Sequence, residues 1–471
     1  MNTHTLRRIL FLTLLIALPL RAQQTQQAQQ SPQTLPAPDD RFKADILVVV
    51  AHPDDEGAAS PYLARAIDEG KRVAVAYGTR GGNGANQVGT EQAGALADIR
   101  EIEARRALAS LGITNVWFLG GSDTASQNVL QSLTSWGHGT ALENLVRIVR
   151  LTRPEIIMTF LPAVFIGENH GDHQAAGVIA TEAFDLAGDP AEFASQVAGP
   201  TKRLESYLEN LRPWQAKKLY YFGFSGHDAE FKSAGPSYSV TGISKTQHIP
   251  YWRVALNSWS MHETQSKSFV APFAKMSDAE VEKAVTAQQG SWASEHTFVL
   301  GKSQVGGSVT GDLFENISST PSPAATHAAR PAGNAAEVSV ELGGPWSFYQ
   351  EFRREHGTEH IPQIATPEIA VQAGGSMYVP LWLHNPTGAA RDITLSATVP
   401  TGWTVQTGAA TFSVRAHDTE ATRIDIAVPE LPGTLTTSAE ISEVVVTATS
   451  NGKTVGVIKL RVQLRKRALP Q

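Results

Sequence analysis

The chain has 471 residues, of which 42% are apolar and 18% charged, the balance of an ordinary globular protein. Its formal net charge is −6 and its basic residues form no stripe, which argues against nucleic acid or an anionic membrane as partner. It has no cysteine, which excludes disulfides, a thiol nucleophile and any cysteine-based metal site. A chain of this length is expected to form two or three domains.

The first 22 residues have the pattern of a secretory signal peptide. Arg7 and Arg8 precede an uncharged apolar run over residues 9–20, and Ala22 closes the segment with a small side chain. The run is too short to span a bilayer and no second apolar segment follows it. The alternative is a buried N-terminal helix. We expect cleavage after Ala22, export to the periplasm or the exterior, and no stable membrane insertion afterwards.

Residues 23–43 are rich in Gln and Pro, which is typical of a disordered spacer. From residue 44 onward, short apolar strands alternate with helices. The strands are predicted at 46–50, 72–77, 116–119 and 156–160, and the helices at 60–69, 90–111 and 141–151. The helix at 60–69 is predicted to begin with Ser60 as N-cap and Pro61 at the first helical position. The helix at 90–111 is predicted to end before Gly112. The alternation indicates an α/β domain, with a parallel sheet covered by helices on both faces.

The domain is predicted to extend over 44–317, with 200–315 as a less regular extension, and a Pro-, Ala- and Ser-rich linker is predicted over 318–366. Beyond it, apolar and other side chains alternate as in β-strands. Two strand-like runs flank Asn451-Gly452, a strong signal for a two-residue hairpin. Residues 367–466 are therefore predicted to form a small β-sandwich of immunoglobulin type.

Two clusters of metal-binding residue types follow predicted strands. His52, Asp54 and Asp55 come directly after the first strand, and His170-Gly171-Asp172-His173 comes after the fourth. Because the carboxyl ends of parallel strands meet at one edge of a sheet, the two clusters are expected to converge there. Either cluster alone has an ordinary structural explanation, as a turn or a helix cap, but the pair indicates a metal site.

The residue types predict how the site would work. Three ligands and one open position for water are typical of catalytic zinc, and His52, Asp55 and His173 provide such a set. Asp54 would then act as general base on the water. His170 would protonate the leaving amine or steady the oxyanion, with Asp172 setting its tautomer. Iron or cobalt remain alternatives to Zn²⁺, because two histidines and one aspartate are not selective by ligand type.

Other polar residues have competing explanations. Arg80, in a Gly-rich turn, is either a substrate ligand or a solvated side chain. Arg100 and Glu103 lie one helical turn apart, which is typical of an exposed ion pair, although Arg100 is also a candidate for substrate binding. His138 and His262 are assigned to structure by default.

Several segments resemble the PIG-L (LmbE-like) deacetylase family. They are residues 51–56, 79–84, 89–92, 100–105 and 170–177. The resemblance spans about 44–310 and implies a Rossmann-like fold and a zinc-dependent N-deacetylase acting on N-acetylglucosamine-bearing molecules. It assigns His52, Asp55 and His173 to zinc and Asp54 to the base. His170 is similar to the acid or oxyanion-stabilising histidine of the family.

Two further resemblances are looser. The sequence Met261-His262-Glu263-Thr264-Gln265 resembles a His-x-Ser-Gln motif that lies near the substrate in the family, which makes His262 a candidate substrate ligand. Thr264 replaces the usual serine and weakens that assignment. The segment from Val399 to Trp403 resembles NEW3-type β-sandwich modules, which are found beside carbohydrate-active domains.

The sequence therefore predicts an exported, zinc-dependent hydrolase that removes acetyl from an N-acetylated amino sugar or glycan. One alternative is a hydrolase of another amide on an amino-sugar conjugate. The other is a glycan-binding protein that has lost activity. The oligomeric state and the identity of the sugar are not determined by the sequence.

Overall fold

The computed structural model describes residues 37–162, 170–199, 207–223, 231–286, 295–318, 337–362, 366–407, 410–430 and 440–465. The predicted signal peptide and most of the predicted spacer lie outside these ranges. Within them, no helix is both long enough and apolar enough to cross a lipid bilayer.

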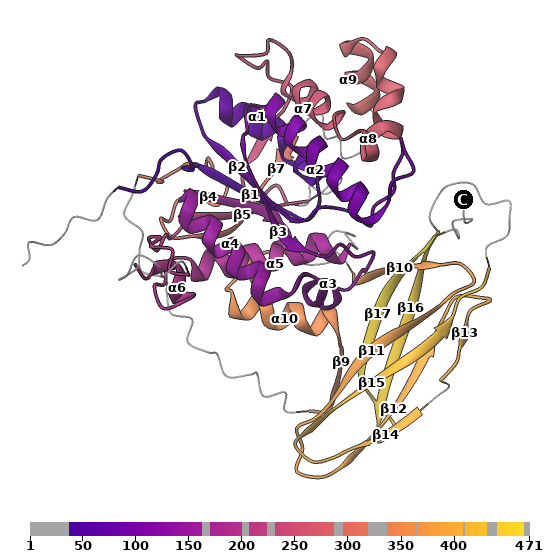
Figure 1. The fold of residues 1–471 in the computed structure, drawn as a ribbon. Coiled ribbons are helices and arrows are strands. Elements are labelled where there is room, and N and C mark those ends of the chain that lie inside the picture. Colours follow the sequence, from indigo (N-terminus) through magenta and orange to yellow (C-terminus); the bar gives the residue numbers. More distant parts are fainter. Residues whose placement is uncertain are drawn as a thin grey trace, which may run out of the picture. The chain divides into compact units, whose positions relative to one another are not determined.

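A six-stranded sheet runs through the α/β region, the described residues from 37 to 318 (Figure 1). Its strands are β1 (Ile46–Val50), β2 (Val73–Thr79), β3 (Asn115–Gly121), β4 (Ile156–Phe160), β5 (Lys218–Phe222) and β8 (Val299–Ser303). They lie in the order β3-β2-β1-β4-β5-β8, and the first five are parallel whereas β8 is antiparallel to β5. The predicted parallel sheet is therefore confirmed except at this edge.

Helices cover both faces of the sheet, as predicted. Those on one side in Figure 1 are α1 (Ser60–Asp68), α2 (Ala93–Ser110) and α7 (Tyr251–Trp259). Those on the other side are α3 (Val129–Trp136), α4 (His138–Thr152) and α5 (Gly171–Leu186). The N-cap of α1 is Ala59, one residue before the predicted Ser60.

Further elements of the α/β region are shorter. They are η1 (Asp55–Ala58), α6 (Ala194–Val197), β6 (Ser237–Ser239), α8 (Glu263–Val270), η2 (Ala271–Lys275), α9 (Asp278–Thr286) and β7 (Glu295–Thr297). All five residues of β1 are buried apolar side chains, as expected of a strand covered on both faces. The short helix η1 follows β1 and α5 follows β4, so both predicted clusters lie at the carboxyl ends of adjacent strands.

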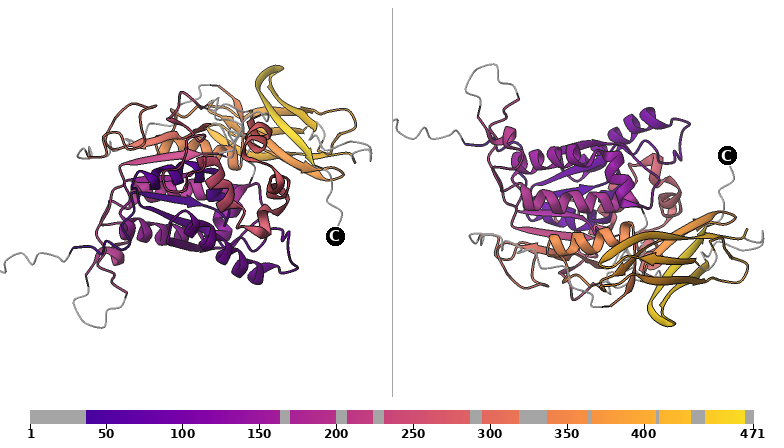
Figure 2. Two further views of the ribbon diagram at one scale, coloured as in Figure 1. Left: turned by 90° about the horizontal axis from the view of Figure 1, so that it is seen from above. Right: turned by 90° about the horizontal axis from the view of Figure 1, so that it is seen from below.

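The C-terminal β region comprises the described residues from 366 to 465 together with β9 (Ser339–Leu342). Its strands are β10 (Glu368–Gln372), β11 (Ser376–Asn385), β12 (Arg391–Thr398), β13 (Thr404–Val405), β14 (Ala410–Val414), β15 (Asp418–Ala427), β16 (Glu440–Ser450) and β17 (Lys453–Arg465). They form two sheets, β10-β17-β16-β12-β14 and β13-β15-β11-β9, and Figure 2 shows the longer ones as twisted ribbons. Apolar side chains from both sheets share one buried cluster.

The hairpin predicted around Asn451-Gly452 is confirmed. Ser450 pairs with Lys453, and both turn residues have positive φ, 50° for Asn451 and 74° for Gly452, as a two-residue turn of this kind requires. That the two sheets form a sandwich of immunoglobulin type stays a prediction.

Part of the segment predicted as linker forms regular structure. The strand β9 pairs with β11, and α10 (Pro345–Glu355) follows it directly. Tyr349 and Phe352 of α10 are buried in the apolar cluster of the α/β region. The linker prediction comes from the Pro-, Ala- and Ser-rich stretch at the start of 318–366. Because β9 and α10 follow that stretch, its composition says nothing about them.

Candidate active site

His52 lies two residues beyond β1, and three carboxylates surround its ring. Nδ1 is 3.2 Å from Oδ2 of Asp55, while Nε2 is 2.8 Å from Oδ1 of Asp123 and 3.2 Å from Oδ2 of Asp172. Burial opposes a charge on this ring, but the charge of Asp55 and the hydrogen bonds of Asp123 and Asp172 raise the pKa of His52 well above its ordinary value. These contacts fix the orientation of the ring, with Nδ1 toward Asp55 and Nε2 toward Asp123 and Asp172.

The carboxylate of Asp55 lies between two imidazoles. Oδ2 faces Nδ1 of His52, and Oδ1 is 3.2 Å from Nε2 of His173. The backbone N–H of His52 also donates to Oδ2 at 2.7 Å, and the ring of His173 stacks on Phe160 with centroids 4.7 Å apart. Burial opposes ionisation of Asp55, yet the charges of His173 and His52 hold its pKa well below the usual value.

This donor set fits a metal of the zinc type. Two imidazoles and one carboxylate are ligands that zinc accepts, and both imidazoles lie 3.2 Å from the carboxylate of Asp55, each from a different oxygen. Asp123 and Asp172 hold the far nitrogen of His52, which is the role that carboxylates play behind metal-binding histidines. The three ligands predicted from the sequence thus come together.

Among the described residues, two groups of three ligand atoms lie close enough together to hold an ion. One contains His52, His170 and His173, and the other contains His52, Asp123 and Asp172. Both include His52 and neither includes Asp55, so these two groups are alternatives to the ligand set predicted from the sequence. The sequence gives Asp123 no role, but it predicts that the turn at 120–123 follows a strand and reaches the same edge of the sheet as the two clusters, and Asp123 does lie there.

Asp54 has a strained backbone, with φ of 117°, outside the region that non-glycine residues ordinarily adopt. Its N–H donates to Oε2 of Glu56 at 3.1 Å, and its Oδ1 accepts from Nη2 of Arg100 at 2.9 Å. Burial raises the pKa of Asp54 to about 6, although the charge of Arg100 lowers it. A carboxyl group with a pKa near neutrality and a fixed direction suits a general base.

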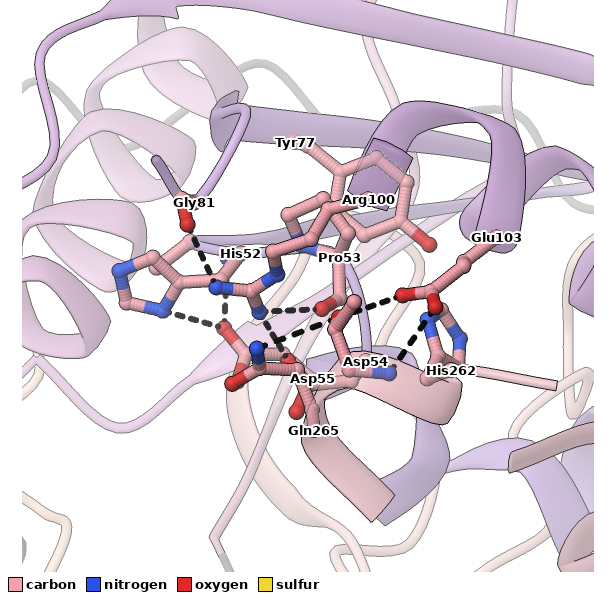
Figure 3. Close-up of polar contacts among 12 residues, drawn as sticks. His52, Pro53, Asp54, Asp55, Tyr77, Gly81, Arg100, Glu103, His262 and Gln265 are labelled. Carbon is pink, nitrogen blue, oxygen red and sulfur yellow. Dashed lines mark hydrogen bonds and ion pairs between the residues drawn. The ribbon is translucent and has the colours of Figure 1, made fainter. Parts of the chain in front are cut away.

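Arg100 donates hydrogen bonds to this turn (Figure 3). Nη2 also donates to the carbonyl of Pro53 at 2.6 Å, and Nη1 donates to the carbonyl of Gly81 at 2.8 Å. Gly81 has φ of 69°, and a Cβ there would collide with the guanidinium, so glycine is required at this position. Only 3% of Arg100 is exposed. This placement favours a positioning role for Arg100 over the substrate contact predicted from the sequence.

The exposed Arg100–Glu103 ion pair considered from the sequence is wrong, because both residues are buried. Glu103 instead accepts hydrogen bonds from Thr264, from its N–H at 2.9 Å and from its Oγ1 at 2.6 Å. Gln265, which follows Thr264 in the chain, donates from Nε2 to the carbonyl of Ala85 at 2.5 Å (Figure 3). The His-x-Thr-Gln segment therefore ties α8 to the Gly-rich loop and to α2.

His262 is fully buried, and its Nε2 is 2.6 Å from Oε1 of Glu56. Burial opposes both charges, but the two groups stabilise one another: the pKa of Glu56 is lowered and that of His262 is raised. The hydroxyl of Tyr77 donates to Oε2 of Glu56 at 2.8 Å. These contacts place His262 beneath the turn that carries Asp54, which favours support of the turn over the predicted contact with substrate.

His170 is the N-cap residue of α5, and its ring lies 4.9 Å from that of His52 and 4.8 Å from that of His173. Its Nε2 is 2.9 Å from the carbonyl oxygen of Thr124. Burial, followed by the charges of His52 and His173, lowers the pKa of His170, which favours the neutral ring. Asp172, predicted to set the tautomer of His170, has its described hydrogen bonds with His52, Ser132 and Thr124.

Arg80 is half exposed and forms ion pairs with α2. Its Nε is 2.8 Å from Oε2 of Glu101, and its Nη2 contacts Asp98. These contacts favour a surface ion-pair role, and substrate binding by Arg80 stays a prediction.

Comparison with known proteins agrees with this geometry. Residues 47–184 match the family model described as PIG-L: GlcNAc-PI de-N-acetylase. That segment begins in β1, ends in α5 and contains the proposed ligands, the proposed base and Arg100. It makes up less than a third of the chain.

Two relatives carry the same name, 1D-myo-inositol 2-acetamido-2-deoxy-alpha-D-glucopyranoside deacetylase. The protein from Thermobifida fusca is 29% identical over 191 residues, which are 37% of this chain and 60% of the relative. One from Frankia alni, numbered deacetylase 1, is 34% identical over 190 residues, 36% of this chain and 59% of the relative. The chain thus spans about three fifths of the length of each relative.

Among solved structures, N,N'-diacetylchitobiose deacetylase from Pyrococcus horikoshii aligns with 16% identity and a TM-score of 0.37, covering 55% of this chain and 84% of that one. The protein TT1542 from Thermus thermophilus aligns with 22% identity and a TM-score of 0.34, covering 54% of this chain and 94% of that one.

Proposed function

We propose that this protein is a zinc-dependent hydrolase that removes the acetyl group from an N-acetylglucosamine-type amino sugar or glycan. The observation that supports it most is the Asp55 carboxylate between His52 and His173, with Asp54 beside it. The match of residues 47–184 to the PIG-L model and the deacetylase names of the relatives support the same reaction class.

His52, Asp55 and His173 would hold the zinc, whose Lewis acidity polarises an amide carbonyl and acidifies water. Asp54 accepts the proton that the attacking water loses, and Arg100 keeps its carboxylate directed while it does so. The proton that Asp54 has taken from the water passes to the departing nitrogen. His170 steadies the charge on the carbonyl oxygen or relays that proton, and for either role its Nδ1 must first be protonated, because its Nε2–H donates to the carbonyl of Thr124. The C–N bond breaks, and acetate and a free amine leave.

We also propose that the protein is exported, on the basis of the first 22 residues alone. Export favours a substrate in the cell envelope or the surroundings. An envelope glycan or an environmental amino-sugar glycoside therefore suits the proposal better than a cytoplasmic intermediate.

The test is acetate release from N-acetylated amino sugars by purified protein supplied with zinc. Asp54→Asn should lower turnover by about 10²–10⁴-fold, because it removes the base, while its metal content stays that of the wild type. Asp392→Asn, a change at an exposed carboxylate of the C-terminal β region, is the matched control and should leave turnover unchanged. Undiminished turnover by Asp54→Asn would refute the proposed base.

A glycan-binding protein without activity is the main rival. It is disfavoured because Arg100 and Glu56 both hold a strained Asp54, an arrangement that costs stability and that a binding surface does not need. Glycan binding by the zinc-loaded wild type, with no acid released from any N-acylated sugar, would favour this rival.

A further inference from the structure

A pocket opens beside Asp54 within the α/β region. Its volume is about 180 Å³, and it is formed by η1, α1, β5, α7, α8 and the segment at β7. The larger apolar side chains that line it are Pro61, Phe222, Leu256, Trp259, Phe269 and Phe298. An engineered apolar cavity of about 150 Å³ is large enough to bind benzene, so this pocket has room for an apolar group of about that size.

The lining suits neither part of an acetamido sugar. Among the described residues that line the pocket, only Asp54, His296 and Thr297 have polar side chains. A sugar hydroxyl buried without a partner costs about 1–3 kcal/mol, so a pyranose ring would bind poorly here. The methyl of an acetyl group is a single carbon and would leave most of the volume unfilled.

The pocket is built on the same turn as the proposed base. A Cβ on Gly57 would lie 2.9 Å from Cδ1 of Trp259, so the glycine allows the indole to pack directly against η1. The ring of Phe269 meets that indole edge-on, with centroids 4.7 Å apart. This wall of the pocket is therefore fixed with respect to Asp54, which begins the turn.

The opposite wall leads toward the proposed metal ligands. Phe222 lines the pocket, and its ring centroid is 5.0 Å from that of Phe160. Phe160 in turn stacks on His173 with centroids 4.7 Å apart. An apolar group in the pocket would thus lie next to Asp54, and two aromatic contacts connect the pocket wall at Phe222 to His173.

We propose that this pocket binds an apolar aglycone, an alkyl or aryl group joined to C1 of the N-acetylated amino sugar. The inference rests on the proposed function. In that function the amide nitrogen is bonded to C2 of the sugar, and its acetyl carbonyl is attacked by the water whose proton Asp54 accepts. C1 is bonded to C2, so a group on C1 lies within a few bonds of the scissile amide. The substrate class is then an N-acetylglucosaminide of an apolar alcohol or phenol.

The experiment compares acetate release from two glycosides that differ only in the aglycone. The wild type should hydrolyse the hexyl glycoside of N-acetylglucosamine with a kcat/KM about tenfold to hundredfold above that of the methyl glycoside. Phe269→Ala should remove most of that advantage, so that the kcat/KM values for the two glycosides become nearly equal. Tyr378→Ala, which removes a half-exposed aromatic ring from β11, is the matched control and should change neither value.

A second variant fills the pocket instead of enlarging it. Ala58→Phe adds a ring at a half-buried lining position and should lower kcat/KM for the hexyl glycoside selectively. Equal kcat/KM of the wild type for the two glycosides would overturn the aglycone assignment while the deacetylase proposal stands. A preference for N-hexanoylglucosamine that Phe269→Ala abolishes would also overturn it, because the pocket would then hold the acyl chain.

Binding separates this inference from the proposed function. The same two glycosides are titrated against the wild type and Phe269→Ala, with tryptophan fluorescence as the signal, since Trp259 lines the pocket. Tighter binding of the hexyl glycoside that depends on Phe269, without acetate release, supports the pocket and refutes the deacetylase. Equal binding of the two glycosides overturns the pocket whatever the activity.

Discussion

The α/β region and the C-terminal β region are both built from apolar strands, but they differ in the polar groups that they bury. At the ends of β1 and β4 the α/β region buries charged side chains, among them Asp55, Glu56, Arg100 and Asp172. In the described strands of the C-terminal β region, the buried polar residues are Asn385 and Ser450. Because buried charges cost stability unless they are paired, a concentration of them marks the region where chemistry takes place.

The buried Asn385 of the C-terminal β region has a structural explanation. Asn385 donates from Nδ2 to the carbonyls of Val414 and Arg415, and its Oδ1 accepts from Thr387. These bonds join the end of β11 to neighbouring loops and involve no titratable group. The comparison therefore favours the α/β region as the place of the proposed catalysis, and a supporting role for the C-terminal β region stays a prediction.

The largest effect is expected from Asp55→Ala, which removes the carboxylate between two imidazoles. Metal affinity should fall by more than the roughly 10–100-fold expected for Asp123→Ala, whose carboxylate touches only the far nitrogen of His52. Elemental analysis measures the metal content of the two purified variants, and acetate release measures their turnover. Wild-type metal content in Asp55→Ala would show that the ion is held by other donors, such as His52, His170 and His173.

Leu383→Ala tests the other side of the comparison. Leu383 is fully buried in the apolar cluster of the C-terminal β region, and its truncation should destabilise that region by about 2–5 kcal/mol. Denaturant unfolding followed by fluorescence measures the loss. Turnover per folded molecule should equal that of the wild type, and a fall in kcat for the folded variant would contradict the supporting role.

Arg100→Lys should lower kcat by about 10–100-fold with KM and metal content unchanged. A lysine ammonium cannot reach Asp54 and the carbonyls of Pro53 and Gly81 with the fixed fork of a guanidinium. Steady-state kinetics on one N-acetylated substrate separate the two parameters. If KM rises and kcat is retained, Arg100 binds substrate, which is the role for which the sequence made it a candidate.

The smallest effect concerns stability at the α4–α5 contact. Nε2 of His138 is 2.6 Å from Oε2 of Glu182, and this hydrogen bond, opposed by burial, raises the pKa of His138 above 6.5. The stabilisation is complete below about pH 6.5 and is lost as the pH rises through the folded-state value. Melting temperatures of wild type and His138→Gln should therefore differ more near pH 6 than near pH 8.5. A difference independent of pH would contradict this linkage.

Much of the α/β region follows from local sequence. The strands at 46–50 and 156–160 coincide with β1 and β4, since uninterrupted runs of apolar residues leave a strand no exposed face. The convergence of His52, Asp55 and His173 follows from the adjacency of the two strands. The hairpin around Asn451-Gly452 is equally local, because a two-residue turn with positive φ limits the residue types it accepts.

Other features depend on partners distant in the sequence, and local pattern contains no information about them. The helical pattern around Arg100 predicts an exposed residue. In the folded chain Arg100 is bonded to the carbonyl of Gly81 and to Asp54, which come from other segments. Glu56 and His262 are 206 residues apart, and only the packing of α7 and η1 brings them together. Asp123 becomes a partner of His52 only because β3 ends at the same edge of the sheet.

The sequence by itself thus determined which residue types follow which strands. Those residue types predict the metal ligands and the class of reaction. The tertiary structure decided which of the remaining polar residues support that set and which face the surface, and it created the apolar pocket beside Asp54 from five separate segments. The physical reason is that backbone propensity and apolar periodicity act between near neighbours. Burial, ion pairing and cavity shape depend instead on contacts between segments that meet only in the folded chain.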